Sequence, residues 1–345
     1  MKTNILLIYT GGTIGMMQDP VSGALKPFNF SHILEEVPEL AKFVCNIDTI
    51  SFDPVIDSSD ASPEFWIDLV TLIRDNYDSY DGFVVLHGTD TMAYSASALS
   101  FMLENLEKPV VFTGSQLPIG MLRTDGRENL ITSIEIAASR DSDGYPCVPE
   151  VCIYFENELY RGNRTVKYNA ENFRAFRSPN YPVLAEVGIH IRFNRDVIHY
   201  PEAWGKPLKI NTNLSNDVAV LKLIPGISRH YVESVMSMPG LRALVLETFG
   251  SGNAPAAKWF IDAVRECVEK GILVLNVTQC GAGSVDMRAY ANGAVLLAAG
   301  VTGGADITME AAVTKLYWLL GESDDNAIVK QRFSECFRGE FSKNN

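Results

Sequence analysis

The sequence predicts an α/β protein with a doubly wound, mostly parallel sheet in its N-terminal domain and a second, smaller α/β domain after it. Short continuous apolar runs alternate with stretches of helical periodicity, which is typical of a parallel sheet covered on both faces. The chain has 345 residues, more than one hydrophobic core usually covers. Together these two observations predict the fold class and the number of domains.

The first domain is expected to alternate strands and helices. Strands are predicted where short apolar runs end in small or polar residues, at 5–9, 82–86, 110–112 and 151–155. Helices are predicted where apolar residues recur on one face, at 63–77, 91–105 and 128–139.

A segment rich in Asn, Pro and Gly is expected to separate the two domains. Residues 188–214 lack clear periodicity, so we place the N-terminal domain at 1–190, a linker at 191–214 and the C-terminal domain at 215–345. The alternation then resumes, with expected strands at 218–224, 243–247 and 272–277 and expected helices at 256–270 and 308–320.

The composition restricts the partners. A formal net charge of −13 argues against nucleic acid or an anionic membrane surface, but it is compatible with a small zwitterionic substrate. No apolar run approaches the roughly 18 residues that a membrane-spanning helix needs. The N-terminal apolar run is too short for a signal peptide, so we expect a cytoplasmic protein. Reduced, mostly buried thiols are expected at Cys45, Cys147, Cys152, Cys267, Cys280 and Cys336, which form no C-x-x-C pair.

Three expected strands end in turns rich in hydroxyl groups, at 10–13 (TGGT), 87–91 (HGTDT) and 113–116 (TGSQ). Ligands of open α/β sheets bind outside the carboxyl ends of the strands, so three such turns together predict a site there. Each turn alone is also compatible with an ordinary helix N-cap.

The glycine-rich first turn has a second interpretation, as a dinucleotide-binding fingerprint. It lacks the G-x-G-x-x-G spacing, and the first aspartate downstream, Asp19, comes too early to reach a ribose. The glycines are better explained by a sharp turn that leaves the Thr13 hydroxyl exposed.

The Thr13 hydroxyl is a poor nucleophile unless a base takes its proton. Only His87 among the five histidines lies in one of the turns, and we interpret it as a packing or hydrogen-bonding residue rather than a base. No histidine or cysteine pair has the spacing of metal ligands. Asp90, beside Thr89, is suited to hold a lysine, and Lys167 is the candidate, although spacing alone favours a solvated surface cation at that position.

Segments along nearly the whole chain resemble the asparaginase family, in particular its cytoplasmic type I branch. They are YTGGTIGM (9–16), HGTDTMAYSASALSFMLENL (87–106), TGSQLP (113–118), LYRGNRTVK (159–167), AEVGIHIR (185–192), GSGNAP (250–255), NVTQC (276–280) and GGADIT (303–308). The paired TGGTI and HGTDTM motifs are specific to this family. The resemblance implies hydrolysis of L-asparagine to L-aspartate and ammonia, without a metal or an organic cofactor.

The resemblance also implies catalytic roles. Thr13 matches the nucleophile that attacks the side-chain amide carbon, releases ammonia and forms a β-aspartyl ester. Thr89, Asp90 and Lys167 match a group that activates a hydroxyl or a water molecule.

Further residues match the family's substrate contacts. Asp57, Ser58 and Ser59 fall where the α-carboxylate and α-ammonium are held, with Thr89 and Asp90 contributing to binding, and Ser115 falls near the departing amide. These residue types suit a zwitterion, which needs donors at one end and a carboxylate at the other. Backbone N–H groups after the first strand are expected to stabilise the developing oxyanion.

Two positions depart from the family pattern. Family members carry a tyrosine on the loop about ten residues after the nucleophile, where this chain has Ala24 or Leu25. Some type I enzymes bind asparagine at an additional effector site, using a threonine before the lysine and a basic residue elsewhere. Val166 and Glu247 stand at those positions, which predicts that this form of allosteric activation is absent.

The family's assembly implies a homodimer or a dimer of dimers, in which Asn253 approaches a neighbouring site. Three alternatives to an asparaginase stay open. A glutaminase-type amidohydrolase differs by about one methylene in pocket depth. The glutaminase-like subunit of a tRNA-dependent amidotransferase is disfavoured, because those subunits carry an extra domain before TGGTI and nine residues precede it here. A non-catalytic asparagine-binding or sensor protein agrees with the missing tyrosine.

Overall fold

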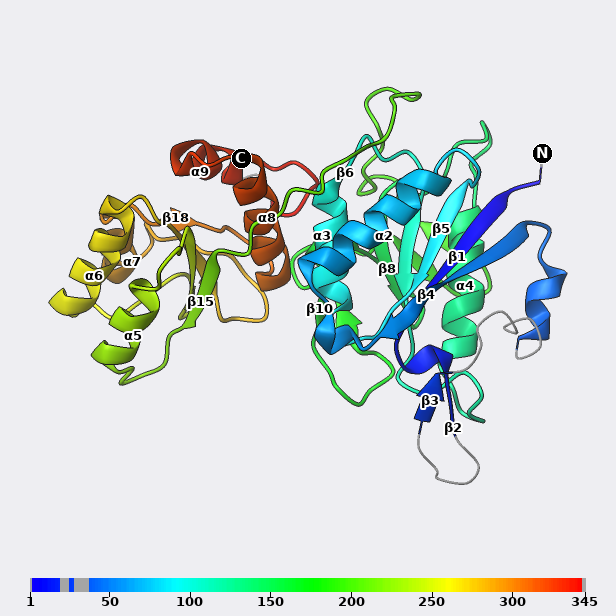
Figure 1. The fold of residues 1–345 in the computed structure, drawn as a ribbon, viewed down its shortest axis with the longest axis horizontal. Helices are drawn as coiled ribbons and strands as arrows, with labels where there is room; N and C mark the ends of the chain where they lie inside the picture. Colours follow the sequence, from blue (N-terminus) through cyan, green and yellow to red (C-terminus); the bar gives the residue numbers. More distant parts are fainter. Residues whose placement is uncertain (1, 19–24, 28–36, 343–345) are drawn as a thin grey trace. The chain divides into compact units, whose positions relative to one another are not determined.

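The computed structural model describes residues 2–18, 25–27 and 37–342. The chain divides into two compact units, Met1–Ile210 and Asn211–Asn345. The large sheet of the first unit has, in order across it, the strands β13 (Ile191–Phe193), β12 (Ala185–Val187), β9 (Glu158–Arg161), β8 (Val151–Phe155), β7 (Val110–Thr113), β5 (Gly82–Leu86), β1 (Asn4–Gly11) and β4 (Asn46–Ile56). From β8 to β4 neighbouring strands are parallel, whereas β9, β12 and β13 run antiparallel to their neighbours (Figure 1).

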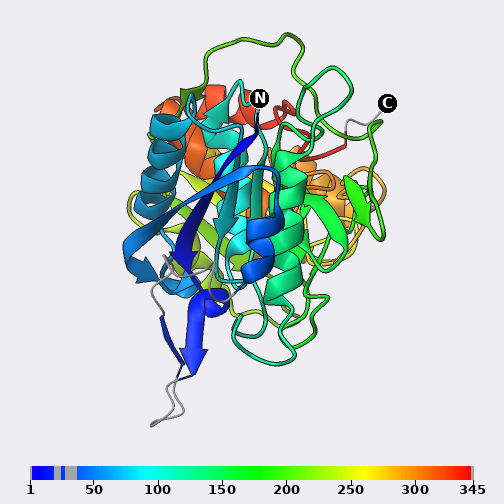
Figure 2. The ribbon, with the colours of Figure 1, turned by 90° about the vertical axis from the view of Figure 1, so that its right-hand side faces the viewer.

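Helices cover both faces of this sheet, because its central strands are apolar on both sides. One face, which includes Leu7 and Val84, packs against Leu130 and Ile134 of α4 (Gly126–Ala138). The opposite face carries Phe83, whose ring stacks on Tyr77 at the end of α2 (Pro63–Asn76). Figure 2 shows α2 and α4 on opposite sides of β1. Together with α3 (Met92–Met102), these helices confirm the predicted doubly wound fold.

The predicted strands and helices of the first domain are all present, with ends within three residues of the expected ones. The segment 191–214 differs from the expected linker. Its residues Ile191–Phe193 form β13 on the edge of the large sheet, and Lys209–Ile210 (β14) pair with Leu103–Glu104 (β6). Backbone hydrogen bonds to existing strands therefore keep residues 191–210 within the first unit, although their sequence has no periodicity.

Short elements complete the described part of the first unit. They are η1 (Thr13–Gly15), β2 (Met16–Gln18) paired with β3 (Leu25–Pro27), η3 (Pro38–Lys42), η4 (Ser58–Asp60), η5 (Gly162–Arg164), and β10 (Val166–Lys167) paired with β11 (Phe176–Arg177). Several of them follow directly on strands of the large sheet, and they carry the candidate site residues Thr13, Ser58, Ser59 and Lys167.

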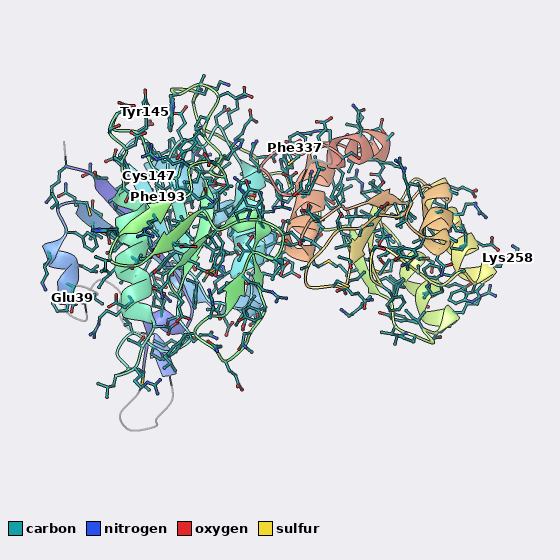
Figure 3. All side chains as sticks on the ribbon, turned by 180° about the vertical axis from the view of Figure 1, so that it is seen from behind. Glu39, Tyr145, Cys147, Phe193, Lys258 and Phe337 are labelled. Atoms are coloured by element: carbon teal, nitrogen blue, oxygen red, sulfur yellow. The ribbon has the colours of Figure 1, made fainter. Side chains whose placement is uncertain are left out.

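The second unit is a smaller parallel α/β domain, as the sequence predicts. Its sheet has the order β15 (Val218–Lys222), β16 (Ala243–Thr248), β17 (Leu273–Thr278) and β18 (Thr302–Gly303). A hydrophobic core joins this sheet to α5 (Arg229–Met236), α6 (Lys258–Glu269) and α7 (Ala291–Ala298). Lys258 marks the exposed start of α6 in Figure 3. The helices α8 (Met309–Glu322) and α9 (Asn326–Phe333) complete the unit.

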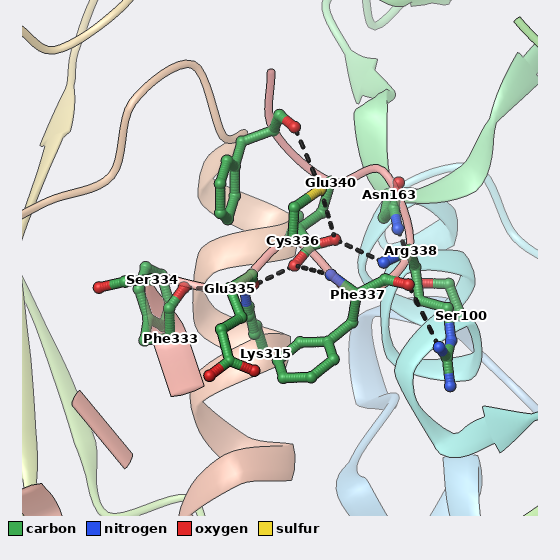
Figure 4. A network of polar contacts seen from close by, with 12 residues as sticks. Ser100, Asn163, Lys315, Phe333, Ser334, Glu335, Cys336, Phe337, Arg338 and Glu340 are labelled. Carbon is green, nitrogen blue, oxygen red and sulfur yellow. Dashed lines mark hydrogen bonds and ion pairs between the residues drawn. The ribbon is translucent and has the colours of Figure 1, made fainter. Parts of the chain in front are cut away.

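A fully buried lysine anchors the C-terminal segment of the second unit. Lys315 on α8 donates to the carbonyls of Phe333 and Glu335, at 2.9 and 2.5 Å, and to Glu340 Oε1 at 2.5 Å (Figure 4). The rings of Phe333, Phe337 and Phe341 surround its ammonium group. Lys315 therefore attaches the segment that follows α9 to α8, and Trp318 of α8 adds an edge-to-face contact with Phe337.

Two general features of the chain bear on the sequence predictions. No helix among the described residues is long and apolar enough to cross a membrane. The cysteines are free, and Cys147, Cys152 and Cys267 are buried, while Cys280 is exposed.

Candidate active site

The turns after β1, β4 and β5 touch one another at the carboxyl edge of the sheet. Gly12 has a φ of 88°, and a Cβ at this position would lie 2.6 Å from the Cα of Gly88. A Cβ at Gly88 would in turn lie 2.4 Å from Ser58 Oγ. Only glycine permits both contacts, so the glycines of the first two turns allow three strand ends to meet.

Thr13 lies at this junction. It is the first residue of η1, directly after the glycine that contacts the β5 turn, and it is half-buried. Ile14, which follows it, accepts a hydrogen bond from the backbone N–H of Ile119 at 3.3 Å. Thr13 is therefore held between the turns after β5 and β7.

Lys167, Thr89 and Asp90 form a hydrogen-bonded group at the same edge. Lys167 Nζ lies 2.7 Å from Thr89 Oγ1 and 2.6 Å from Asp90 Oδ1. The Lys167 side chain is 15% exposed and that of Asp90 is 66% exposed. The interpretation of Lys167 as a solvated surface cation is wrong, because β10 directs its ammonium group onto the β5 turn.

The backbone before Lys167 is fixed by a buried ion pair. Arg161 Nε lies 2.6 Å from Glu150 Oε2, and both side chains are almost fully buried. The Thr165 hydroxyl donates to the Arg161 carbonyl at 2.7 Å and closes the turn around η5. This turn fixes the backbone from which Lys167 extends.

The proposed substrate ligands Asp57, Ser58 and Ser59 form a short turn after β4. Asp57 Oδ1 accepts hydrogen bonds from the backbone N–H and the hydroxyl of Ser59, at 2.9 and 2.8 Å. These two bonds lower the pKa of Asp57, which favours its anionic form. Ser58 is buried, and its carbonyl accepts a hydrogen bond from Thr91 Oγ1 at 2.6 Å. Asp57 also caps η4, so the N-cap interpretation and a binding role are both compatible with its geometry.

The turn after β7 brings Ser115 and Gln116 to the site. Ser115 is buried, and its hydroxyl donates to the Leu117 carbonyl at 2.5 Å. Gln116 Oε1 accepts a hydrogen bond from Thr89 Oγ1 at 3.3 Å. Gln116 is not among the residues predicted from the sequence, although it follows Ser115 in a turn at a strand end. The carboxylate of Asp125 accepts the backbone N–H groups of Gln116 and Leu117 and fixes the turn.

His87 is a buried, neutral hydrogen-bonding residue. The Gly88 carbonyl only accepts, so neutral His87 carries its proton on Nδ1 and accepts the Ser95 hydroxyl at Nε2, at 2.9 Å, while Ser95 accepts from Trp66 Nε1 at 2.9 Å. His87 Nδ1–H then donates to the Gly88 carbonyl at 2.7 Å. Burial lowers the pKa of His87 to about 4. Both ring nitrogens are engaged in this chain, as the interpretation of His87 as a hydrogen-bonding residue expects.

The remaining positions singled out in the sequence lie elsewhere. Asn253, in the second unit, is bonded through its backbone N–H to the Phe249 carbonyl at 2.8 Å. Glu247 is paired with Lys222 at 2.9 Å, and Val166 lies on β10. Ala24 lies outside the described residues. Among the residues that the structure describes, no cluster of three His, Cys, Asp or Glu side chains is arranged to hold a metal ion.

Fold and site together define a class of protein. The chain is a two-unit α/β protein in which a threonine, a second hydroxyl, a lysine and carboxylates gather at the strand ends of the larger unit. Groups of this kind serve in nucleophilic acyl transfer, where a hydroxyl attacks a carbonyl carbon and a neighbouring base carries the proton.

Comparison with known proteins places the chain within this class. The family model described as "Asparaginase, N-terminal" matches residues 4–199, and "Glutaminase/Asparaginase C-terminal domain" matches residues 217–333. L-asparaginase 1 of Escherichia coli K12 is 44% identical over 99% of this chain and 98% of that protein. The mouse 60 kDa lysophospholipase is 41% identical over 93% of this chain and 59% of that protein. The crystal structure of L-asparaginase I from Vibrio cholerae has a TM-score of 0.90 and 40% identity, covering 99% of this chain and 100% of that one. The chain belongs to the asparaginase family.

Proposed function

We propose that this protein hydrolyses L-asparagine to L-aspartate and ammonia. The observation that carries the proposal is the hydrogen-bonded group of Thr89, Asp90 and Lys167 beside the turn that holds Thr13. The full-length similarity to enzymes named L-asparaginase supports the choice of substrate.

A zwitterionic substrate fits the charges around this group. The carboxylates of Asp57 and Asp90 are suited to an α-ammonium, and the hydroxyls of Ser58 and Ser59 are suited to an α-carboxylate. Asp57 is anionic at neutral pH, and its hydrogen bonds with Ser59 lower its pKa further. With the α-groups held there, the side-chain amide extends towards Thr13 and Ser115.

The proposed reaction has two steps. In the first, Thr13 Oγ bonds to the amide carbon as its proton leaves to a base, and the C–N bond then breaks as the nitrogen gains a proton and departs as ammonia. In the second, water attacks the β-aspartyl ester, aspartate is released and Thr13 regains its proton. Lys167 and Thr89 exchange protons with the reacting groups, and backbone N–H groups after β1 stabilise the oxyanion.

Steady-state ammonia release from asparagine and glutamine, measured side by side, tests the substrate. Discrimination between the two amides by about one methylene of pocket depth is worth roughly 1–3 kcal/mol, or up to about 200-fold in kcat/KM. Higher kcat/KM for glutamine would make the protein a glutaminase-type enzyme. Asparagine binding in calorimetry without ammonia release would make it a binding or sensor protein.

Thr13→Ala tests the nucleophile. Turnover should fall by about 10³-fold or more, because the covalent route is lost. Thr314→Ala is the matched control, since this buried threonine bonds to the Glu310 carbonyl within α8 of the second unit and should change turnover less than about twofold. Wild-type turnover in Thr13→Ala would exclude this mechanism.

The assembly and the compartment are part of the proposal. We expect a homodimer or a dimer of dimers in the cytoplasm, in which Asn253 faces a neighbouring active site. Analytical ultracentrifugation measures the assembly, and Asn253→Ala should raise KM without altering the fold. A monomeric, fully active protein would contradict this arrangement.

A further inference from the structure

The side chain of Gln116 bridges the active-site hydroxyl and the loop that follows the lysine. Its Oε1 lies 3.3 Å from Thr89 Oγ1, and its Nε2 donates to the Asn172 carbonyl at 3.1 Å. The Gln116 backbone N–H is bound by the Asp125 carboxylate, so the side chain starts from a fixed position.

This bridge determines which way the Gln116 amide faces. A backbone carbonyl only accepts hydrogen bonds, so the amide nitrogen must point to Asn172 and the amide oxygen must point to Thr89. The side-chain oxygens of Asn169 and Asn172 accept backbone N–H groups within residues 169–174, and these bonds hold the loop that presents the carbonyl.

The direction of the Thr89 proton follows from the orientation of the amide. An amide oxygen donates nothing, so the hydroxyl proton of Thr89 is directed at Gln116. The Thr89 oxygen then accepts from Lys167, whose ammonium group also donates to Asp90. The order of donors is therefore Lys167 to Thr89 to Gln116.

The two bonds of the Thr89 hydroxyl differ in length. Its contact with Lys167 is 2.7 Å long and its contact with Gln116 is 3.3 Å long. Hydrogen bonds between oxygen atoms are usually about 2.7–2.8 Å long, so the bond to Gln116 is a weak one. This bond orients the Thr89 hydroxyl, but an acceptor at the usual hydrogen-bond distance would replace Gln116.

We propose that Gln116 is a positioning residue that holds the Thr89 hydroxyl proton in the free protein and releases it when substrate arrives. Because the Thr89 proton points only to Gln116, Lys167 is the donor to the Thr89 oxygen. Lys167 is then ready to pass a proton through Thr89 to the departing amide nitrogen. This inference rests on the proposed function but concerns a residue that acts only through Thr89.

Steady-state ammonia release separates this role from substrate contact and from packing. Gln116→Met keeps the length of the side chain but removes the acceptor, so kcat should fall about tenfold while KM stays within about twofold. Gln116→Glu keeps an acceptor for Thr89 and should restore most of the lost kcat, although its carboxylate cannot donate to the Asn172 carbonyl. Gln279→Met is the matched control, since the Gln279 amide bonds to two carbonyls in the second unit and its loss should leave kcat unchanged.

Each other outcome overturns the proposal. Unchanged kcat in Gln116→Met would mean that Gln116 only fills space. A rise in KM alone would make it a substrate contact. Equal losses in the Met and Glu variants would mean that the bond to Asn172, rather than the bond to Thr89, matters.

A second measurement needs no turnover and therefore separates this inference from the proposed function. In protein with ¹³C-labelled threonine methyl groups, the order parameter of Thr89 should fall in Gln116→Met because its side chain loses a restraint. The order parameter of Thr91, bonded to the Ser58 carbonyl at 2.6 Å, should stay unchanged. If wild type releases no ammonia but its Thr89 order parameter is higher than that of Gln116→Met, the proposed function alone is refuted. An unchanged Thr89 order parameter would refute the role of Gln116.

Discussion

Two lysines, one in each unit, form ion pairs of nearly equal length in contrasting surroundings. Lys167 lies 2.6 Å from Asp90 and keeps access to water, with side chains 15% and 66% exposed. Lys315 lies 2.5 Å from Glu340, and both of these side chains are fully buried. The other partner of Lys167 is a reactive hydroxyl, whereas those of Lys315 are backbone carbonyls and aromatic rings.

The contrast shows that a perturbed charge is not by itself a catalytic group. Burial lowers the pKa of Lys315 despite the opposing charge of Glu340. Burial also opposes ionisation of Glu340, yet the Lys315 charge and hydrogen bond keep its pKa below the ordinary value. No substrate can reach such a sealed pair. A lysine–carboxylate pair marks a site only where a reactive partner is accessible, as at Lys167.

The largest expected effect is that of Lys167→Met on catalysis. We expect kcat to fall by about 10³-fold or more, because the group that exchanges the proton with Thr89 is lost. The free energy of unfolding should change by less than about 1 kcal/mol, since Asp90 stays solvated. Ammonia release and urea unfolding measure the two quantities. If Lys167→Met lost stability but kept its turnover, Lys167 would be a structural residue rather than a catalytic one.

Lys315→Met should show the opposite pattern. The free energy of unfolding is expected to fall by about 3–5 kcal/mol, because Glu340 would be left buried without its partner. Glu340→Gln added to Lys315→Met should recover part of this loss, since the buried charge is then removed as well. The folded Lys315→Met protein should turn over asparagine within about twofold of wild type. A large fall in kcat without a fall in stability would give Lys315 a functional role that its burial does not predict.

A different contrast, between buried and edge strands, explains which strands the sequence could predict. The strands β5 and β8 lie at the predicted residues, because strands buried on both faces leave continuous apolar runs. The edge strand β4 places acidic residues such as Asp48 in solvent, and so its pattern lacks such a run. The three-residue strands β12 and β13 depend on pairing, β12 with β9 and β13 with β12, which no local pattern encodes.

Some residues of the candidate site could be predicted from the sequence and others could not. Hydroxyl groups at strand ends, including Thr13 and Thr89, were accessible to sequence reasoning because the turn follows the strand directly. Lys167 is 78 residues from Thr89 in the chain, so only the fold or a family resemblance could join them. The orientation of the Gln116 side chain depends on the conformation of the loop around Asn172, and the polar residues of this loop have no periodicity that predicts it.

The smallest of these effects concerns His87, which is as deeply buried as Lys315 but carries no charge. Because its pKa is about 4 in the folded protein and about 6.5 when unfolded, the unfolded chain binds the extra proton first as the pH falls. The contribution of neutral His87 to stability is therefore complete above pH 6.5 and is lost as the pH falls towards 4. Linkage gives a loss of roughly 2–3 kcal/mol between pH 7.5 and pH 4.5. Urea unfolding of wild type and His87→Phe at both pH values isolates this term, because other titrating groups cancel in the difference. An equal pH dependence of the two proteins would mean that His87 titrates in the folded protein as it does in the unfolded chain, and its bonds to Ser95 and Gly88 would then have to be reassigned.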